Sequence, residues 1–438
     1  MPRKLRKPLY SFDGTGITHY GGLTLFLQFC KLIGLKRFLA RHVRWGWTGH
    51  RWTPSELFLR HLLMTVAGVG RIENSVTLKY NGVLAELMGM EGFPGPHALR
   101  AFLLSVGDRA LEDLYAAHDV LRTILLNHPE PIYAAVVDLD TTTLPVQGHP
   151  EGAVKGYVPH FFGQRCYSAR LLTETRRGLT LRGELRSGSA HGVLGAASFL
   201  TEGTRLLPTH VPRQRVRVRA DSAFYDKSFV QAVENQGFSY VIDVRIARPV
   251  SNRLGGLRYR EFRHGYEVGE MMYQPCHWPE PVRCVVVRRV RSLVSPPATL
   301  FTLKDYAYTV QATNLDLSPE AVWRFYCDRA QQELLIRELK GHYALGKIPT
   351  RRFLANRVHL EILLWAYDVV GWFRRICLPA DWQRSTLASM RRDLWNVPGY
   401  LTHSGRACHL RLPERFEHQD IFRHAQRKLA RVRPLDAL

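Results

Sequence analysis

The sequence predicts an α/β protein in which a mixed β-sheet core carries a mainly β insertion and follows an α-helical N-terminal region. Three observations support this fold class. The first 130 residues have apolar side chains at helical spacing, residues 132–244 alternate between strand and helix patterns, and residues 247–316 consist mainly of β segments separated by turn residues. A chain of 438 residues is long enough to form two or three domains.

Helical signals dominate the first 130 residues. Residues 23–39 are apolar at helical spacing, and residues 53–56 (TPSE) have the pattern of a capping box with proline in the first turn. Residues 96–106 follow a Gly/Pro turn, as the second helix of a helix-turn-helix does. An ordinary packed helix has the same pattern, so no base-reading residue is identified.

From residue 132 the pattern becomes that of a β-sheet. Three strands are expected at residues 132–140, 165–173 and 179–185. A helix at 191–207, a strand at 215–221 (RVRVRAD), a helix at 226–237 and a strand at 238–244 follow. Three strands, a helix, a strand, a helix and a strand are the element order of an RNase H-like sheet.

A mainly β module is expected between this fifth strand and the next helix. Its β segments are residues 267–273, 282–290 and 299–313. The next helix begins at Ser318-Pro319, a cap followed by proline. Further helices are expected at residues 353–377, 385–395 and 418–432, the last two in a basic tail.

The chain is strongly basic, with 61 Lys and Arg against 38 Asp and Glu and a formal charge of +23. Such an excess predicts a polyanionic partner, with nucleic acid first and an anionic membrane second. A basic composition can also reflect only solubility or habitat, and that alternative remains open at this point.

Cysteine usage and hydropathy indicate the compartment. The seven cysteines are scattered and include no CxxC pair, so neither a disulfide framework nor a zinc site is indicated and a reducing compartment is expected. The N-terminus lacks the apolar run of a signal peptide, and the most apolar segment, residues 360–373, is too short for a bilayer and carries Glu361 and Asp368. We therefore expect a cytoplasmic, nucleoid-associated protein without a membrane partner.

Residues 326–340 contain no helix breaker. On one continuous helix, a single arc of about 60° would hold four side chains: Tyr326, Arg329, Glu333 and Lys340. One carboxylate among cations suits a group that holds a metal ion while its neighbours hold phosphates, and the tyrosine ring could stack on an unpaired base. An ordinary basic helix with a packed tyrosine explains any one of these cations or the tyrosine equally well.

Two aspartates end predicted strands, Asp140 the first and Asp221 the fourth. If these strands are neighbours, the two carboxylates meet at one edge of the sheet, where Glu333 can close over them. Three carboxylates in one pocket repel each other unless cations neutralise them. A pair of Mg²⁺ ions about 3.5–4 Å apart, for which Mn²⁺ can substitute, would do so and would activate a water or a 3′-hydroxyl for attack on a phosphodiester.

Each of these acids also has an ordinary structural interpretation, as a strand-end cap or a solvated helix residue. Asp138 points to the same strand face as Asp140 and is the alternative first ligand. Asp226 and Asp243 are interpreted as a helix cap and a strand residue, and His191 as a capping or packing residue.

Together these segments resemble an insertion-sequence transposase of the DDE superfamily, in the group with a YREK signature and an RNase H-like, retroviral-integrase core. The strands VVDLDTT (136–142) and RVRVRADSAFY (215–225) and the helix YxxRxxxExxxxxxK (326–340) match that pattern in order. Three shorter segments are similar to the family blocks QEGAxxGYNP, LRxGN and DSGF: residues 151–157, 185–189 and 221–224. The departures are His149-Pro150 before the first block, Val158, Ser189 and Ala223.

The resemblance, which covers residues 130–375 well, implies that Asp140, Asp221 and Glu333 bind two Mg²⁺ ions. It also implies cut-and-paste transposition, in which the ends of the element are cleaved and a 3′-hydroxyl attacks target DNA. The expected partners are terminal inverted repeats, target DNA and a second subunit in a homodimer on paired ends. Tyr326, Arg329 and Lys340 are expected to contact terminal phosphates, with a hairpin intermediate associated with this group.

The expected domains are a helical DNA-binding domain (1–130), a DDE catalytic domain (131–376) with its insertion at about 247–316, and a basic C-terminal helical tail (377–438). Two other functions remain possible on the same fold. One is a DNA nuclease that does not join strands, and the other is a catalytically inactive, domesticated DNA-binding protein.

Overall fold

The computed structural model describes residues 10–438 except 48, 50, 88, 90, 91, 157–162, 191, 291–305 and 406. Three residues singled out from the sequence lie outside the described residues: Tyr157, Val158 and His191. The chain divides into two compact units, one of residues 1–105 and 369–438 and one of residues 106–368. In this division residues 377–438 fall in the first unit, and the domain boundaries expected at residues 130 and 376 stay a prediction. In the described part of the chain, no helix has the length and apolar character needed to cross a membrane.

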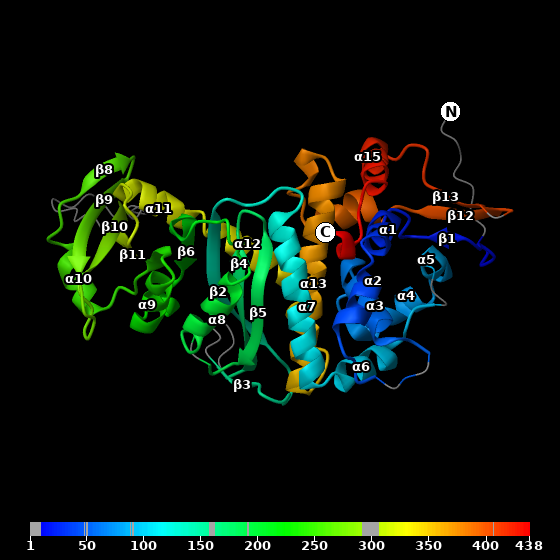
Figure 1. Cartoon of the computed structure of the whole chain (residues 1–438), viewed down its shortest axis with the longest axis horizontal. Coiled ribbons are helices and arrows are strands. Elements are labelled where there is room, and N and C mark those ends of the chain that lie inside the picture. Colours follow the sequence, from blue (N-terminus) through cyan, green and yellow to red (C-terminus); the bar gives the residue numbers. More distant parts are fainter. Residues whose placement is uncertain are drawn as a thin grey trace, which may run out of the picture. The chain divides into compact units, whose positions relative to one another are not determined.

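The second unit is built on a mixed sheet with the predicted RNase H-like order of elements (Figure 1). Its first strands are β2 (Ala135–Pro145), β3 (Val154–Lys155), β4 (Arg165–Glu174), β5 (Leu179–Ser187), β6 (Val216–Ala220) and β7 (Ser239–Asp243). β4 pairs antiparallel with β2 and β5, and β6 lies parallel between β2 and β7. Unlike the prediction, β2 continues five residues beyond Asp140, because residues 141–145 pair with β4.

Helices cover both faces of this sheet. Leu171 and Leu172 point to opposite faces because successive strand residues alternate. Leu171 lies on the face where Leu364 of α13 (Phe353–Cys377) packs on β5, and Leu172 packs beside Gly203 of α8 (Ala196–Thr204). The remaining helices on the sheet are α7 (Asp108–Asn127), α9 (Lys227–Asn235), α11 (Pro319–Cys327) and α12 (Ala330–Gly341).

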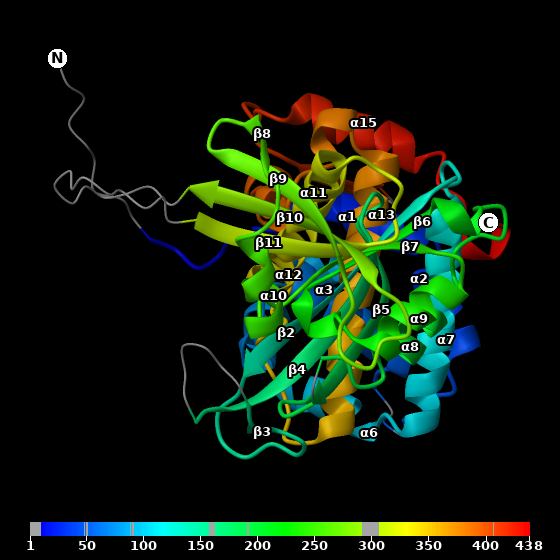
Figure 2. The same cartoon turned by 90° about the vertical axis from the view of Figure 1, so that its left-hand side faces the viewer.

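The predicted insertion extends the same sheet instead of forming a separate module (Figure 2). It contains α10 (Arg248–Leu254), β8 (Arg260–Arg263), β9 (Tyr266–Tyr273), β10 (Val282–Val290) and β11 (Tyr306–Thr313). β11 pairs antiparallel with β7, and β10, β9 and β8 follow in order, which gives ten strands in the described part of the sheet. Val241 of β7, Val285 of β10 and Val322 of α11 share one buried hydrophobic cluster. Residues 299–305 of the third predicted segment lie outside the described residues.

The helix predicted over residues 326–340 is interrupted at Asp328–Arg329, although no residue there breaks helices. In a continuous helix the Arg329 N–H would bond to the carbonyl of Phe325. That carbonyl instead accepts a hydrogen bond of 2.7 Å from Arg219, and the Arg329 N–H bonds to the Tyr326 carbonyl. A buried side chain of β6 therefore ends α11 and allows α12 to start in a new direction.

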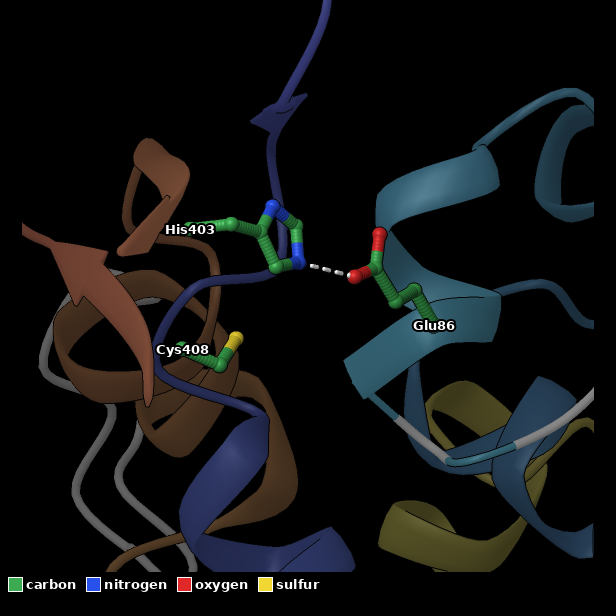
Figure 3. A group of neighbouring side chains, drawn as sticks. All are labelled: Glu86, His403 and Cys408. Atoms are coloured by element: carbon green, nitrogen blue, oxygen red, sulfur yellow. Dashed lines mark hydrogen bonds and ion pairs between the residues drawn. The ribbon is translucent and has the colours of Figure 1, made fainter. Parts of the chain in front are cut away.

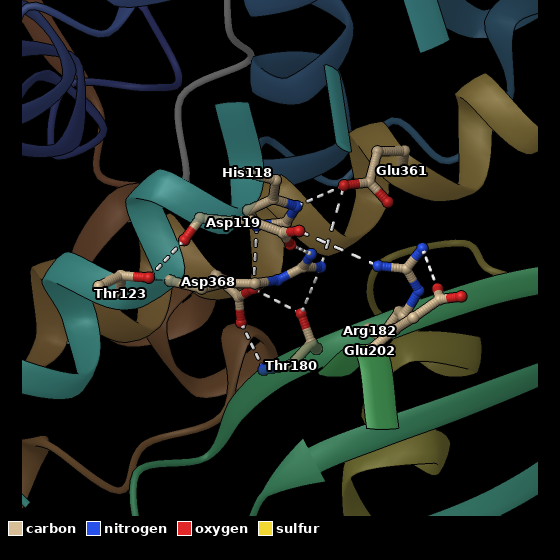
Figure 4. Close-up of polar contacts among 9 residues, drawn as sticks. His118, Asp119, Thr123, Thr180, Arg182, Glu202, Glu361 and Asp368 are labelled. Carbon is tan, nitrogen blue, oxygen red and sulfur yellow. Dashed lines mark hydrogen bonds and ion pairs between the residues drawn. The ribbon is translucent and has the colours of Figure 1, made fainter. Parts of the chain in front are cut away.

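Within the second unit, a buried polar cluster joins α7, β5 and α13 (Figure 4). Nδ1 of His118 lies 2.5 Å from Oε1 of Glu361, and Nε2 lies 3.1 Å from Oδ2 of Asp368. Asp368 also accepts from the backbone N–H and the hydroxyl of Thr180, and Arg122 donates to the same hydroxyl. Because every member is buried, the cluster fixes how α7 and α13 are seated on β5.

The first unit is mainly helical. Its N-terminal elements are β1 (Ile17–Thr18), α1 (Thr24–Leu32), α2 (Leu35–His42), α3 (Pro54–Val66), η1 (Ile72–Ser75), α4 (Val76–Lys79), α5 (Gly82–Leu87) and α6 (Pro96–Ser105). Its C-terminal elements are η4 (Ala380–Trp382), α14 (Leu387–Met390), η5 (Arg391–Trp395), β12 (Gly399–Ser404), β13 (Ala407–Arg411), α15 (Gln419–Leu429) and η6 (Leu435–Ala437). Thr53 and Glu56 form the predicted capping box of α3.

Two features of the first unit join its N-terminal and C-terminal segments. Aromatic rings of Phe26, Phe29 and Phe373 pack edge to face, and Trp395 contacts Phe26 and Phe373. β12 and β13 form an antiparallel hairpin in the segment that the sequence suggested to be a helical tail, and β1 pairs with β12.

Candidate active site

Three aspartates form a row across neighbouring strands. The parallel register pairs residue 139 of β2 with residue 220 of β6, and residue 220 with residue 242 of β7. The next residue of each segment is an aspartate: Asp140, Asp221 and Asp243. By this register their side chains lie at the same level and on the same face of the sheet. Asp221 follows the end of β6 but keeps an extended backbone, with φ −79° and ψ 178°.

Asp243 is the member of this row that sequence reasoning missed. It was interpreted as a strand residue, yet it ends β7 as Asp221 follows β6. The available signal was that both strands have an apolar, alternating pattern with an aspartate at the C-terminal end. That signal becomes specific only when the two strands are known to be parallel neighbours.

Asp140 is largely buried and contacts a cation. Its Oδ2 lies 2.9 Å from Nη2 of Arg329, and its Oδ1 accepts a hydrogen bond of 2.7 Å from the backbone N–H of Thr141. Burial raises the pKa of the Asp140 carboxyl to about 6 against the effect of Arg329, and the charges of Asp221 and Glu333 raise it further. Asp221 and Glu333 therefore lie close enough to influence the ionisation of Asp140.

The other two aspartates of the row have similar environments. Asp221 accepts a hydrogen bond of 3.0 Å from the backbone N–H of Ala223, and burial raises its pKa while Arg329 opposes the rise. Burial also raises the pKa of Asp243 to about 6, Gln311 opposes this, and Asp221 adds to it. The three aspartates thus concentrate negative charge in a part of the protein that is largely shielded from water.

Glu333 and Arg329 reach this row from α12 and the turn before it. Glu333 lies in the first turn of α12 with its side chain 62% exposed, and its Oε1 is 3.6 Å from Nη1 of Arg329. Burial disfavours the charge of Arg329, but Asp140 and the weaker contributions of Tyr326, Asp221 and Asp138 together outweigh it, so the pKa of Arg329 is raised. One guanidinium group thus lies between Asp140 and Glu333, which brings the predicted glutamate to the aspartates.

The remaining two signature residues occupy different environments. Tyr326 packs against the hydrophobic cluster of the insertion, and burial together with the charge of Asp243 raises the pKa of its hydroxyl. Lys340 is exposed at the end of α12, and its Nζ donates a hydrogen bond of 3.1 Å to the Thr143 carbonyl of β2. Burial lowers the pKa of Lys340, and the charge of Asp140 opposes this.

Asp138, the alternative first ligand, is fully buried and engaged. Arg219 donates to both of its carboxylate oxygens, at 2.7 and 2.8 Å, and the Thr175 hydroxyl donates to Oδ2 at 2.5 Å. The third nitrogen of Arg219 holds the Phe325 carbonyl at the end of α11. Asp138 therefore acts on the site through Arg219, by fixing the junction that carries Tyr326 and Arg329.

Gly156 and Gly188, from two of the family-like blocks, lie against each other and against Cys166 of β4. A Cβ atom on Gly156 would lie 2.5 Å from the carbonyl oxygen of Gly188, and one on Gly188 would lie 2.4 Å from the carbonyl oxygen of Cys166. Glu151 of the first block accepts a hydrogen bond of 3.2 Å from the backbone N–H of Phe353, at the start of α13. These blocks therefore support β4 and β5 at Cys166, which pairs with Pro145 of β2, and glycine is required there by close backbone approach.

The donors gathered here suit a hard divalent cation. The groups that can ligate at the site are carboxylate oxygens, which favour Mg²⁺ or Mn²⁺ over metals that prefer nitrogen and sulfur. Burial is the largest cause of the raised pKa values of Asp140 and Asp243, and it disfavours their charged forms. The chemistry of these donors therefore matches the divalent ions that the sequence suggested.

An RNase H-like sheet that gathers acids from adjacent strands and from a late helix is the arrangement of DDE enzymes. The chain belongs to the family described as transposase DDE domain group 1, whose sequence profile matches residues 3–434. Membership of this family assigns the protein to DNA transposition.

Two solved structures are similar to the chain. A piggyBac transposase synaptic complex with hairpin DNA is 11% identical, with a TM-score of 0.44 over 80% of this chain and 74% of that chain. A Mos1 transposase paired-end complex with the left transposon end is 14% identical, with a TM-score of 0.19 over 45% of this chain and 60% of that chain. A sequence comparison with curated proteins gave no match.

Proposed function

We propose that the protein is a cut-and-paste transposase that cleaves the ends of an insertion sequence and joins the 3′-hydroxyls to target DNA. The observation that carries the proposal is the convergence of Asp140, Asp221 and Glu333 on one side of the sheet, with Arg329 spanning the first and the last. These three acids would hold two Mg²⁺ ions, with Mn²⁺ as a substitute. When bound, such a pair supplies charge neutralisation and lowers the pKa of an oxygen nucleophile.

The burial of Asp138 favours Asp140 as the first ligand. Both oxygens of Asp138 are bound to Arg219 within the protein, whereas Asp140 lies at the level of Asp221 beyond the end of β6. Asp243 lies on the far side of Asp221 in the same row. It is a further carboxylate at the same level of the sheet, and we assign it to the charge balance of the second ion.

The cations beside the acids would position the DNA backbone. The guanidinium group of Arg329 is planar and can bind two oxygens of one phosphate. When cations neutralise the acids, Arg329 can therefore exchange its contacts with them for contacts with a phosphate. Lys340 extends the positive path to the end of α12. The raised pKa of Tyr326 keeps its hydroxyl protonated, so it can donate a hydrogen bond to a phosphate oxygen but cannot act as a base near pH 7.

Glu333→Gln is the sharpest test, because it keeps the size of a side chain that is largely exposed. The variant should bind end DNA as the wild type does and lose cleavage in Mg²⁺ by about 10³-fold or more. The matched control is Glu338→Gln, which changes a neighbouring glutamate of the same helix and should keep activity. Strand transfer at the wild-type rate in the Glu333 variant would contradict the assignment.

The products separate this proposal from the alternatives. The protein is incubated with Mg²⁺, a plasmid target and DNA carrying the ends of its own element. Joined products support the transposase, cleavage without joining supports a nuclease on the same fold, and retention of DNA without cleavage supports an inactive DNA-binding protein.

We further propose that two subunits act on paired ends, in the nucleoid, and that cleavage proceeds through a hairpin at the transposon end. The mass of the complex with end DNA, measured by light scattering, tests the first point. A denaturing gel tests the hairpin, since a hairpin runs as one strand of twice the length.

A further inference from the structure

Three side chains from distant parts of the sequence meet on the surface of the first unit (Figure 3). Glu86 lies on α5, His403 on β12 and Cys408 on β13, and one ligand atom from each lies within 4.8 Å of the other two. His403 and Cys408 are register partners in the antiparallel hairpin, so their side chains share one face. Nε2 of His403 points at Glu86 and lies 2.5 Å from its Oε1.

The chemistry of these donors differs from that of the acid row. An imidazole nitrogen, a thiolate sulfur and a carboxylate oxygen are the three ligand types that zinc takes in proteins. Three protein ligands leave one tetrahedral position for water. Mg²⁺ prefers oxygen ligands and would not use the thiolate. We propose that Glu86, His403 and Cys408 form a zinc site of this protein, separate from the acids that carry out the reaction.

The observed geometry needs only small changes to hold the ion. Zinc bound at about 2.0–2.3 Å to each donor places tetrahedral donors about 3.3–3.7 Å apart. The 2.5 Å contact between His403 and Glu86 must therefore open by about 1 Å. The Cys408 sulfur lies within 4.8 Å of both donors and so needs to approach them by no more than about 1.5 Å. The side chains of His403 and Glu86 are 58% and 50% exposed, so rotation about their side-chain bonds provides this movement. The thiol proton of Cys408, and any proton shared between His403 and Glu86, pass to solvent as the metal binds.

The ion would cross-link two segments of the first unit. Glu86 and His403 are 317 residues apart in the sequence. A bond through zinc would hold the β12–β13 hairpin against α5 and would stabilise the folded unit in proportion to the occupancy of the site. The sequence could not show this site, because its ligands have none of the close Cys and His spacings of zinc motifs.

Cobalt substitution tests the site directly, because Co²⁺ bound to a thiolate gives a charge-transfer absorption that oxygen ligands do not give. The full-length protein is titrated with Co²⁺ and then with Zn²⁺, and the variants Cys408→Ser and His403→Ala are treated in the same way. The wild type should show the thiolate band at one equivalent and lose it to Zn²⁺. Cys408→Ser should lack the band, and both variants should bind Zn²⁺ at least about tenfold more weakly.

Cys276→Ser is the matched control, because Cys276 is also exposed but lies in the other unit. This control should keep the band and the wild-type Zn²⁺ affinity. The acid row gives no thiolate band, so it cannot produce the signal. Circular dichroism of each variant checks folding. A band that persists in Cys408→Ser, or equal Zn²⁺ affinity in the wild type and both variants, overturns the proposal and leaves His403 and Glu86 as a simple ion pair.

Discussion

Arg219 binds both carboxylate oxygens of Asp138, at 2.7 and 2.8 Å, and both side chains are almost completely buried. The same guanidinium holds the Phe325 carbonyl and so determines where α11 ends. Two aspartates only two residues apart in β2 thus have different roles. Asp138 fixes the backbone that carries Tyr326 and Arg329, and Asp140 faces the acids.

This difference predicts opposite results for two isosteric substitutions. Asp138→Asn leaves the buried charge of Arg219 without its partner and should lower the free energy of unfolding by about 3–5 kcal/mol. Asp140→Asn removes a carboxyl whose raised pKa shows that its charge is disfavoured, and it should unfold at the same or a higher urea concentration while losing cleavage. Urea titrations and a cleavage assay compare the two. Equal stability of both variants would contradict the role given to Arg219.

Lys340→Ala should separate binding from stability. Its ammonium makes one hydrogen bond to a carbonyl from an exposed position, so the free energy of unfolding should change by less than about 1 kcal/mol. If it binds one phosphate of the cleaved end, the slope of log K against log salt should fall by about 0.9. Binding is measured from about 50 to 200 mM salt. The control Lys347→Ala changes another exposed lysine and should not weaken binding of cleaved ends selectively.

Asp243→Asn tests the aspartate that the strand register adds to the site. If its charge helps to hold the second ion, the variant should bind DNA normally and cleave it about 10–100-fold more slowly at low Mg²⁺. Part of this loss should be recovered as Mg²⁺ is raised. Cleavage rates over a Mg²⁺ series check the point, and an unchanged Mg²⁺ dependence would return Asp243 to a purely structural role.

The glycines of the family-like blocks should be intolerant of any side chain. In Gly188→Ala the new Cβ would lie 2.4 Å from the carbonyl oxygen of Cys166, so the backbone of β4 or β5 must move. We expect a loss of about 1–3 kcal/mol or more in the free energy of unfolding. Gly346→Ala places its Cβ in open space and should change stability by no more than about 0.5 kcal/mol. Thermal and urea unfolding of the two variants give the comparison.

The buried pair of His118 and Glu361 makes stability depend on pH in two opposing ways. Burial raises the pKa of Glu361 to about 7, so its protonated form stabilises the fold at low pH and this contribution is lost as pH rises from about 4.5 through 7. Burial lowers the pKa of His118 to about 3, so its contribution is lost as pH falls below about 6.5. Arg122 opposes the shift of Glu361 and adds to that of His118, whereas Asp368 opposes the shift of His118.

Glu361→Gln should remove one of these contributions and leave the other. The free energy of unfolding of the wild type minus that of the variant should fall by about 1–3 kcal/mol between pH 4.5 and 7.5. Within this pair only His118 still titrates in the variant, so its contribution to the free energy of unfolding should be lost on acidification below about pH 6.5. Urea unfolding at a series of pH values measures both. A difference that does not vary with pH would show that Glu361 stays ionised in the folded protein.

The sequence predicted the parts of the fold that local periodicity determines. The alternation in residues 215–221 identified β6, the apolar spacing of residues 353–377 identified α13 to the residue, and Thr53 and Ser318 mark helix starts that the structure contains. The RNase H-like order followed from those elements. Which acids act stays a proposal, which rests on the strand register of Asp140 and Asp221 and on the contacts of Arg329 with Asp140 and Glu333.

The features that the sequence missed depend on partners far along the chain. Nothing local interrupts a helix at Asp328, because the interruption comes from Arg219, which takes the Phe325 carbonyl. Asp243 gained importance only through the parallel register of β6 and β7. Likewise, the β12–β13 hairpin lies between the two helices expected in the basic tail, and its pairing with β1 joins residues nearly a whole chain apart.

The continuous ladder from β2 through β6, β7 and β11 to β8 has a mechanical consequence. An appended lobe on a flexible tether could swing freely, but strands bonded edge to edge offer no joint about which the outer portion could pivot. If the DNA partner contacts β8–β10, the sheet would keep that contact at a fixed offset from Asp140 and Asp221. Any adjustment of the offset would then require the DNA to bend.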